Sequence, residues 1–290
     1  MIRYEGTLYR PPSEARSLIV QATIGCSNNT CTFCSMYKEK SFRIRPIDEI
    51  IKDFETGREM YRFVQRIFIA DGDALIMPME YWKTILDTIQ RLFPECERVT
   101  CYATAKSILK KSIDELIYLR NNGLAMVYMG LESGSDEILT RINKGITSKQ
   151  MIEAANMLHE AEIDISVTAI NGLGGSELLV HHAEETGKVL SKMKPSYIGL
   201  LTLLIEPGTP LYDQHNMGDF KLLTAEEVLW EIKIIIENCD CPGSVFRANH
   251  ASNFLPLKGT LNRDKEYLIS QINQALDGKK MLNPDWMRGL

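Results

Sequence analysis

"SLIVQATIGCSNNTCTFC", residues 17–34, joins an apolar run to three cysteines that lie within nine positions. The run 17–25 predicts a buried strand. Cys26, Cys31 and Cys34 follow this strand in a polar loop. In parallel α/β folds the chemistry lies at the carboxyl ends of the strands, so this stretch predicts the place of the functional site as well as the start of the fold.

Further apolar runs alternate with segments of helical periodicity along the chain. Strands are predicted at 66–71, 98–104, 125–132, 163–172, 196–206 and 244–250, and helices at 47–54, 79–89, 112–123, 147–161, 177–192, 224–238 and 264–277. Three of the helices begin with a capping-box pair, at Ser112, Thr147 and Thr224. Apolar strands that alternate with helices predict a parallel sheet with helical cover.

Six or seven strand–helix units in series favour an α/β fold of the partial (β/α)6 TIM-barrel type over a two-halved dinucleotide-binding fold. We expect residues 1–215 to form the barrel core. Residues 216–290 are expected to form a short C-terminal α/β extension that packs on the barrel or closes it. The sequence contains no internal repeat, low-complexity segment or obvious linker.

Composition excludes several classes of protein. The chain has 290 residues, of which 44% are hydrophobic, so it can bury a sizeable core. Its net charge of −5 argues against a broad basic surface for nucleic acid. No uncharged apolar run reaches the roughly 18–20 residues of a membrane span, and residues 1–17 lack the apolar core of a signal peptide. We therefore expect a cytoplasmic protein, in a compartment where disulfides are rare.

The cysteine cluster has three chemical interpretations. A structural zinc ion requires four ligands, and a distant residue such as Cys96 or His250 would have to supply the fourth. Buried thiols without a ligand fit poorly in so polar a loop. An iron–sulfur cluster prefers cysteine ligands, and three thiolates on a four-iron cubane leave one iron open for a substrate or cofactor.

The cysteine motif also resembles that of a known family. A cysteine triad after the first strand of a βα barrel, with the aromatic Phe33 directly before the third cysteine, resembles the radical S-adenosylmethionine (SAM) superfamily. The family usually has three residues and then two between its cysteines, whereas four residues, "SNNT", separate Cys26 from Cys31 here. The resemblance covers roughly residues 17–215. It is strongest to members similar to oxygen-independent coproporphyrinogen oxidase and to the methylthiotransferases.

This resemblance implies a [4Fe–4S] cluster held by Cys26, Cys31 and Cys34, with SAM bound at the open iron. In the family, an electron passed through the cluster cleaves SAM, and the resulting 5′-deoxyadenosyl radical removes a hydrogen atom from an organic substrate. The resemblance therefore implies an enzyme with a small-molecule substrate and an electron donor such as flavodoxin or ferredoxin. The alternative is a non-catalytic iron–sulfur, SAM-binding or haem-carrier protein on the same scaffold.

"FIADGDAL", residues 68–75, lies where the family has a glycine-rich turn that receives the amino group of SAM. Asp71, Gly72 and Asp73 occupy this turn. The glycine lets backbone approach a ligand, and a carboxylate accepts hydrogen bonds from an ammonium group. Backbone carbonyls could bind the amino group instead, and a plain Asp-Gly turn is the structural alternative.

"YMGLESGSDEILTRINKG", residues 128–145, resembles the fourth-strand region of the family. By position, Glu132 would reach the SAM ribose, and Lys144 would pair with the SAM carboxylate. Ser133 is a second ribose candidate. The chemistry agrees, because a carboxylate suits a diol and an ammonium group suits a carboxylate. A solvated helix start with exposed charges is the structural alternative.

Two later segments complete the list of candidates. "VTAINGLGG", residues 167–175, resembles the fifth-strand motif of the family, which implies that Ile170 and Gly172 pack on adenine. Residues 246–261 concentrate polar side chains at a predicted strand end, and polar groups at such a place often bind substrate. Arg247 and His250 are the catalytic candidates in this segment. A hydrogen-bonded structural crossing is the alternative for both residues.

Overall fold

The structure is a computed structural model that describes residues 2–289. These residues form two compact units. The first contains residues 2–29, 36–129 and 156–165, and the second contains residues 30–35, 130–155 and 166–289. These divisions differ from the expected boundary after residue 215, which stays a prediction.

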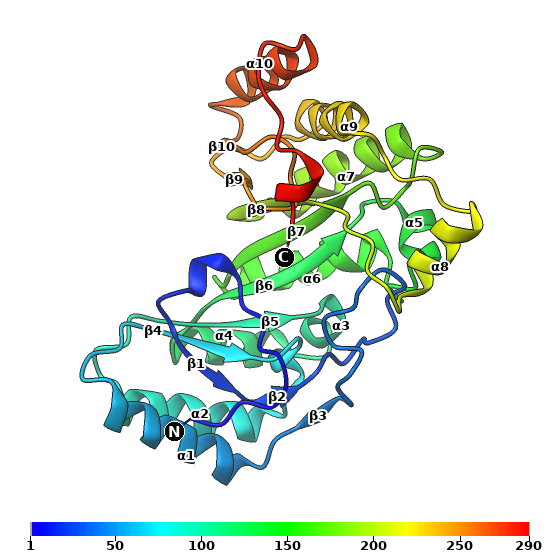
Figure 1. Ribbon diagram of the computed structural model, residues 1–290. Helices are drawn as coiled ribbons and strands as arrows, with labels where there is room; N and C mark the ends of the chain where they lie inside the picture. The colour runs from blue at the N-terminus through cyan, green and yellow to red at the C-terminus, as the bar shows by residue number, and fades with distance from the viewer. Residues whose placement is uncertain (1, 290) are drawn as a thin grey trace. The chain divides into compact units, whose positions relative to one another are not determined.

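The first unit contains a parallel sheet with the strand order β1, β4, β5, β6 (Figure 1). The strands are β1 (Leu18–Gln21), β4 (Arg66–Ala70), β5 (Arg98–Ala103) and β6 (Leu124–Glu132), the last of which extends beyond this unit. The helices are α1 (Ile47–Met60), α2 (Met79–Leu92), α3 (Ala105–Ile108) and α4 (Ile113–Asn121), with short 3-10 turns η1 (Pro12–Glu14) and η2 (Ala74–Ile76). Helix α1 packs against β1 and α2.

Continuous apolar runs explain why these strands form a sheet with helical cover. Ile67, Phe68, Ile69 and Ala70 of β4 have no solvent exposure, so both faces of the strand are covered. The capping box predicted at Ser112 is present, since its side chain accepts from the Glu115 N–H at the start of α4.

The second unit contains β7 (Asp164–Asn171), β8 (Tyr197–Thr202), β9 (Val245–Ala248) and β10 (Leu257–Thr260) in that order. Strands β7, β8 and β9 run parallel, and β10 is antiparallel to β9. The helices are α5 (Asp136–Arg141), α6 (Ser148–Glu160), α7 (Leu179–Met193), α8 (Pro210–Met217), α9 (Ala225–Glu237) and α10 (Lys265–Leu276), followed by the 3-10 turn η3 (Asp285–Met287). Residues 156–160 of α6 belong to the first unit. Helix α9 packs against both α7 and α10 (Figure 1).

The predicted α/β class, with mostly parallel strands and alternating helices, is confirmed. One strand prediction was wrong in detail, because the run 17–25 forms β1 and a second short strand, β2 (Thr23–Ile24). The break lies at Ala22, after which β2 leaves the parallel sheet and pairs antiparallel with β3 (Arg43–Ile44). The predicted strand 196–206 ends at Thr202, and the residues that follow it form a loop.

Strand β10 and helices α5 and α8 of the second unit escaped sequence analysis, as did the 3-10 turn η3. Strand β10, "LKGT", is too short and too polar to show a period. Helix α8 begins inside the segment "EPGTPL", where the Thr209 side chain accepts from the Tyr212 N–H and Pro210 occupies the first turn. Across residues 2–289, no helix has both the length and the apolar character needed to cross a bilayer.

Candidate functional site

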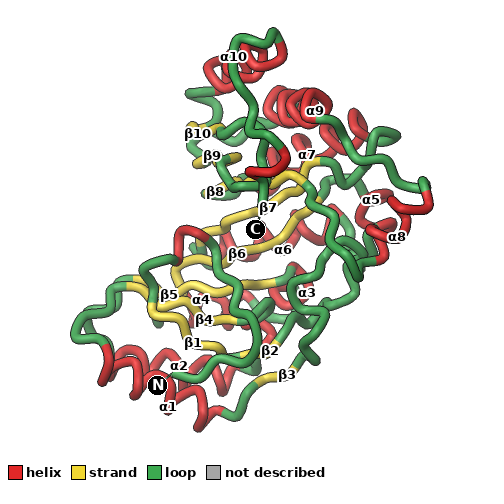
Figure 2. The backbone as a smooth tube through the Cα atoms, viewed as in Figure 1, coloured by secondary structure: helices red, strands yellow, loops and turns green. Residues whose placement is uncertain are grey.

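The loop that carries the cysteines joins β2 to β3, and residues 25–42 contain neither helix nor strand (Figure 2). The first unit holds the start of this loop at Gly25, which adopts a positive φ of 75°. The Gly72 N–H donates to the Gly25 carbonyl at 3.1 Å. Cys26 follows directly and is half-buried, so the turn after β4 fixes the backbone from which this thiol projects.

The buried side chain of Asp71 holds the same loop through hydrogen bonds. Its side chain is fully buried, and Oδ2 accepts from the Gly25 N–H at 3.2 Å, from Gln21 Nε2 at 3.0 Å and from Lys40 Nζ at 2.7 Å. The Asp71 N–H in turn donates to Thr23 Oγ1. One carboxylate oxygen therefore ties both ends of the cysteine loop to the sheet. Among the described residues Oδ1 has no partner, so Asp71 keeps one acceptor for a ligand.

The side chain of Asp73 is hydrogen-bonded to neighbouring groups of the protein. Its buried carboxylate accepts hydrogen bonds from the hydroxyls of Ser27, Thr104 and Ser107 and from the Thr104 N–H. Burial raises the pKa of Asp73, although these hydrogen bonds oppose the shift. The expected contact of this side chain with an ammonium group has no support in this geometry. A contact through the backbone of residues 71–73, the alternative given by the sequence, stays a prediction.

Gly72 is required for close packing at this turn. A Cβ atom placed there would lie 2.7 Å from Tyr37 Cε2 and 2.9 Å from Cys26 Cβ. Real Cβ atoms do not approach other carbons this closely. The glycine therefore lets the cysteine loop pack directly on the end of β4.

The second unit contains the middle of the cysteine loop, residues 30–35. The Thr32 N–H donates to the Ile142 carbonyl at 2.9 Å, and the Leu211 N–H donates to the Thr32 carbonyl at 3.0 Å. Cys31 is buried, and Phe33 and Cys34 are half-buried. The ends of α5 and α8 thus fix the backbone that carries these two thiols and the aromatic ring.

Glu132 and Lys144 form an ion pair in the second unit. Glu132 Oε1 accepts from Lys144 Nζ at 2.7 Å, and the side chains are only 12% and 14% exposed. Glu132 has a positive φ of 62°, which turns the chain sharply at the end of β6. A Cβ on Gly130 would lie 2.0 Å from Glu132 Oε1, so the glycine leaves room for the pair. The two candidates therefore occupy one partly buried polar patch, which excludes the exposed-charge alternative.

Ser133 and Ile170 are joined through His182 on α7. The Ile170 carbonyl can only accept, so His182 Nε2–H donates to it at 3.1 Å. Burial lowers the pKa of His182 to about 4, so the ring is neutral and Nδ1 accepts from the Ser133 hydroxyl at 2.8 Å. Ser133 is fully buried, and its hydroxyl proton is used in the hydrogen bond to His182. Its geometry favours a structural role over the expected contact with a ribose.

Gly172 ends β7 in a turn with a φ of 88°, and its N–H donates to Glu231 Oε2 on α9 at 2.7 Å. Burial raises the pKa of Glu231 to about 8. Glu231 Oε1 and both side-chain atoms of Asn171 are buried and have no hydrogen-bond partner among the described residues. Sequence analysis missed Asn171 and Glu231, although Asn171 lies inside the quoted segment "VTAINGLGG".

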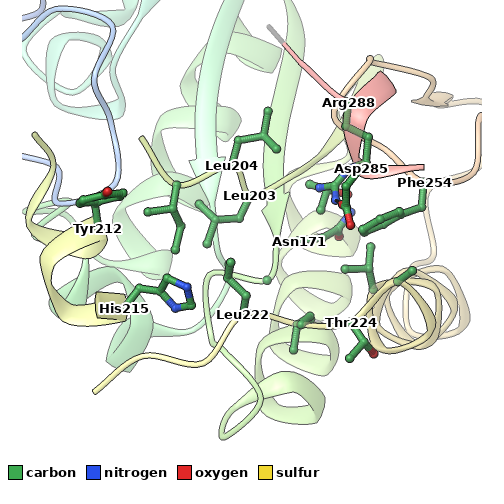
Figure 3. A pocket seen from close by; sticks show the side chains of 16 residues that line it. Asn171, Leu203, Leu204, Tyr212, His215, Leu222, Thr224, Phe254, Asp285 and Arg288 are labelled. Carbon is green, nitrogen blue, oxygen red and sulfur yellow. Dashed lines mark hydrogen bonds and ion pairs between the residues drawn. The ribbon is translucent and has the colours of Figure 1, made fainter. Parts of the chain in front are cut away.

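A cavity of about 510 Å³ opens at this point in the second unit (Figure 3). Its walls come from the ends of β7 and β8, from the loop and helix that follow β8, from the start of α9 and from the C-terminal segment. Residues that represent these walls are Asn171, Thr202, Leu203, His215, Phe254 and Arg288. This volume lies in the range of small-molecule sites.

Arg247 and His250 do not line this cavity. Arg247 lies within β9, is exposed, and donates to the carbonyls of Phe246 and Gly259. His250 Nδ1 accepts from the Ser252 N–H at 3.1 Å, and burial lowers the pKa of this ring. Local hydrogen bonds account for both side chains, and a catalytic role for either stays a prediction.

The three loop thiols are the donor set that could hold a metal centre. None of the seven cysteines is disulfide-bonded. Across the described residues, no group of three or more His, Cys, Asp or Glu side chains surrounds a single-ion position. A cubane cluster places its thiolate ligands on separate irons, so it does not require such a group. Three thiols without a carboxylate among them fit the soft ligand preference of an iron–sulfur cluster.

Comparison with known proteins agrees with this chemistry. A family model described as the radical SAM superfamily matches residues 20–190. The heme chaperone HemW of Bacillus subtilis (strain 168) is 21% identical over 222 residues, which cover 73% of this chain and 57% of the relative. The chain spans about half the length of the relatives it matches.

Two solved structures share the fold at low sequence identity. Coproporphyrinogen III oxidase (HemN) from Escherichia coli aligns with a TM-score of 0.58 and 16% identity, over 77% of this chain and 54% of that one. The methyltransferase TsrM from Kitasatospora setae, with cobalamin and a [4Fe–4S] cluster bound, aligns with a TM-score of 0.54 and 14% identity, over 67% of this chain and 38% of that one.

The packing of Gly72 gives a first prediction. Gly72→Ala should displace the cysteine loop, because the new methyl group would overlap Tyr37 and Cys26. Overpacking of this kind typically destabilises by about 1–3 kcal/mol. We expect a lower free energy of unfolding in denaturant and less iron bound per chain after anaerobic reconstitution. Gly199→Ala is the matched control, since the nearest atoms lie 3.8 Å from its Cβ. Equal behaviour of the two variants would contradict the role given to Gly72.

The buried carboxyl group of Glu231 gives a second prediction. Between its ordinary pKa near 4.5 and its raised value of about 8, the folded chain holds a proton that the unfolded chain has lost. Stability from this group therefore falls as the pH rises through that window. The thermal midpoint of the wild type, relative to Glu231→Gln, should be lower at pH 9 than at pH 6. Glu226→Gln, on the exposed side of α9, should follow the wild type. A difference between wild type and Glu231→Gln that does not change with pH would refute the assignment.

Proposed function

This chain belongs to the radical SAM superfamily, and we propose that it is an enzyme that acts on a small organic substrate. The observation that carries the proposal is the cysteine loop between β2 and β3, anchored by Asp71 and packed on Gly72. When bound, a [4Fe–4S] cluster supplies the electron that cleaves SAM and produces a 5′-deoxyadenosyl radical able to remove a substrate hydrogen atom.

Cys26, Cys31 and Cys34 would hold the cluster as thiolates. Their spacing places three soft ligands in one short loop. Backbone hydrogen bonds fix this loop at Gly25 and at Thr32. The loop has one more residue between its first two cysteines than the family usually has. Such a loop can still present all three thiols, because the extra residue lies in the turn Ser27–Thr30.

Charged and apolar groups at the strand ends would hold SAM. The ammonium group of Lys144 suits a carboxylate, and the carboxylate of Glu132 suits the two hydroxyls of a ribose. In the protein these groups neutralise each other at 2.7 Å, so a ligand would exchange with an existing ion pair. The backbone at Gly72 would receive the amino group, and Ile170 and Gly172 would pack on the adenine ring.

The enzyme would need a one-electron donor, for which flavodoxin or ferredoxin has the right chemistry. Thiolates and iron–sulfur clusters are preserved in reducing surroundings, so we place the reaction in the cytoplasm. The experiment is anaerobic reconstitution with iron and sulfide, reduction with dithionite, addition of SAM and detection of 5′-deoxyadenosine. Formation of 5′-deoxyadenosine would support the proposal.

A second candidate is a non-catalytic carrier of haem or of a cluster. The similarity to the heme chaperone HemW favours it. The same reconstituted protein separates the two candidates, because a carrier would bind its cluster and SAM and release no 5′-deoxyadenosine under any reductant.

A third prediction concerns the cysteines. Cys26→Ala, Cys31→Ala and Cys34→Ala should each abolish the brown cluster and reduce SAM cleavage to background, because the remaining two thiolates cannot hold the cubane. Iron, sulfide and 5′-deoxyadenosine are the measurements. Cys96→Ala is the control, since this half-buried cysteine lies outside the loop. Stoichiometric zinc without iron or sulfide, lost on replacement of Cys96, would establish the structural-zinc interpretation instead.

A fourth prediction concerns the ion pair. Lys144→Ala should weaken SAM binding by about tenfold or more, since a charge-assisted hydrogen bond contributes roughly 1.5–3 kcal/mol. The iron content should not change. Calorimetric titration of the anaerobic protein measures the affinity. Lys188→Ala, which removes an exposed lysine paired with Glu184 and Glu185 on α7, should bind SAM like the wild type. An unchanged affinity in Lys144→Ala would remove Lys144 from the SAM site.

A further inference from the structure

The cavity of the second unit is built mostly outside the part of the chain that defines the family. Of the 16 residues that line it, only Asn171 and Gly172 lie within residues 20–190, which match the family model. The remaining walls come from residues 202–288. A wall that lies outside the shared domain suits a ligand particular to this chain better than a cofactor common to the family.

Asn171 places an unpaired amide group in the wall of this cavity. The side chain has no solvent exposure, and neither Oδ1 nor Nδ2 finds a partner among residues 2–289. Buried polar atoms without hydrogen bonds are rare in folded proteins, because they lose their hydration without a compensating partner. In Figure 3 the residue lies between the leucine wall and the C-terminal segment. A ligand that offered a donor and an acceptor side by side would satisfy both atoms at once.

The rest of the wall is largely apolar. Leu203, Leu204 and Leu222 contribute side chains from the loops around α8, and Phe254 closes the opposite side (Figure 3). His215 Nδ1 donates to the Phe220 carbonyl at 3.0 Å, because a carbonyl can only accept. Apolar walls of this kind favour a flat or compact organic body.

The charged groups of the wall are already paired. Arg288 Nε donates to the Ser252 carbonyl at 2.7 Å, Nη1 lies 2.5 Å from Asp285 Oδ1, and the guanidinium stacks 3.6 Å over the Phe254 ring. Among the 16 lining residues, Arg288 is the one Arg or Lys and Asp285 the one Asp or Glu. Because each compensates the other, the wall provides no uncommitted charge for an ionic ligand.

We propose that this cavity is the substrate site of the enzyme and that Asn171 recognises a lactam or carboxamide edge on an uncharged, mainly apolar substrate. The proposal rests on the proposed function in calling the ligand a substrate. The Asn171 Oδ1 would accept from the ligand N–H, and Nδ2 would donate to the ligand carbonyl. Glu231, which accepts from the Gly172 N–H, is a positioning residue that holds the turn directly after Asn171.

Gly172, which would pack on adenine, also lines this cavity, and adenine carries a donor beside an acceptor, so SAM itself is a competing occupant. Competition with SAM separates these two occupants. A substrate must bind together with SAM, whereas SAM would itself fill the cavity if the cavity were its adenine site. The probe therefore has to be tested with and without saturating SAM on the same cluster-loaded protein, with all 290 residues present.

The probe pair is 2-quinolone, a neutral bicyclic lactam, and N-methyl-2-quinolone, in which a methyl group replaces the donor hydrogen. Anaerobic calorimetric titration should show one 2-quinolone per chain. The N-methyl compound should bind about tenfold more weakly, which corresponds to one hydrogen bond. Saturating SAM should leave both affinities within about twofold. Asn171→Leu should bind the two compounds equally, because it removes both polar atoms and keeps a similar volume.

Asn249→Leu is the matched control, since this exposed asparagine lies outside the cavity, and it should keep the tenfold preference. If Asn171→Leu fails to fold, Asn171→Asp serves in its place. This variant should bind 2-quinolone more weakly than the wild type, because a carboxylate cannot donate to the lactam carbonyl. The proposal is overturned by equal binding of the two compounds to the wild type, by displacement of 2-quinolone by SAM, or by no saturable binding.

Measurement of 5′-deoxyadenosine on the same samples keeps the two proposals distinct. Lactam discrimination without SAM cleavage would remove the proposed reaction and leave a lactam-binding cavity. SAM cleavage without lactam discrimination would support the proposed reaction and contradict the proposed substrate class.

Discussion

The buried contact between the Asp71 carboxylate and the Gly25 N–H is the constraint on which the candidate site depends. A fully buried carboxylate is unfavourable unless hydrogen bonds and a countercharge compensate it. Here Gln21, Gly25 and Lys40 all converge on one oxygen, and they come from the strand before the cysteine loop, from its first residue and from its far end. The carboxylate thus fixes an otherwise irregular loop, which a soft metal centre needs if its ligands are to remain in place.

Polar side chains at the strand ends fall into two groups. The side chains of Asp73 and Ser133 form hydrogen bonds with neighbouring residues, so they stabilise the turns that carry the site. Asn171, by contrast, is buried without partners in the described part of the chain. Because buried polar groups are rarely left unpaired, a group of the second kind points to a ligand more strongly than one of the first.

Sequence analysis gave the α/β class and most of the helices, because continuous apolar strands and capping boxes are local signals. It also singled out the three cysteines, since their spacing is unusual in a polar loop. It did not show which partners the side chains of Asp73 and Ser133 bind, and their roles at the SAM site stay predictions. A carboxylate or hydroxyl after a strand has the same sequence whether it faces a ligand or the protein, and only the positions of Thr104, Ser107 and His182 distinguish the two.

By itself, the sequence determined the α/β class with its longer strands and helices, the placement of the thiols after the apolar run 17–25 and the family to which the chain belongs. Each of these depends on residues that are neighbours in the chain. The tertiary structure alone decided that β2 leaves the parallel sheet, that Glu132 pairs with Lys144, and that Asn171 lies unpaired in a cavity walled by the C-terminal segment. These outcomes depend on contacts between residues distant in sequence, whose burial and pairing no local pattern encodes.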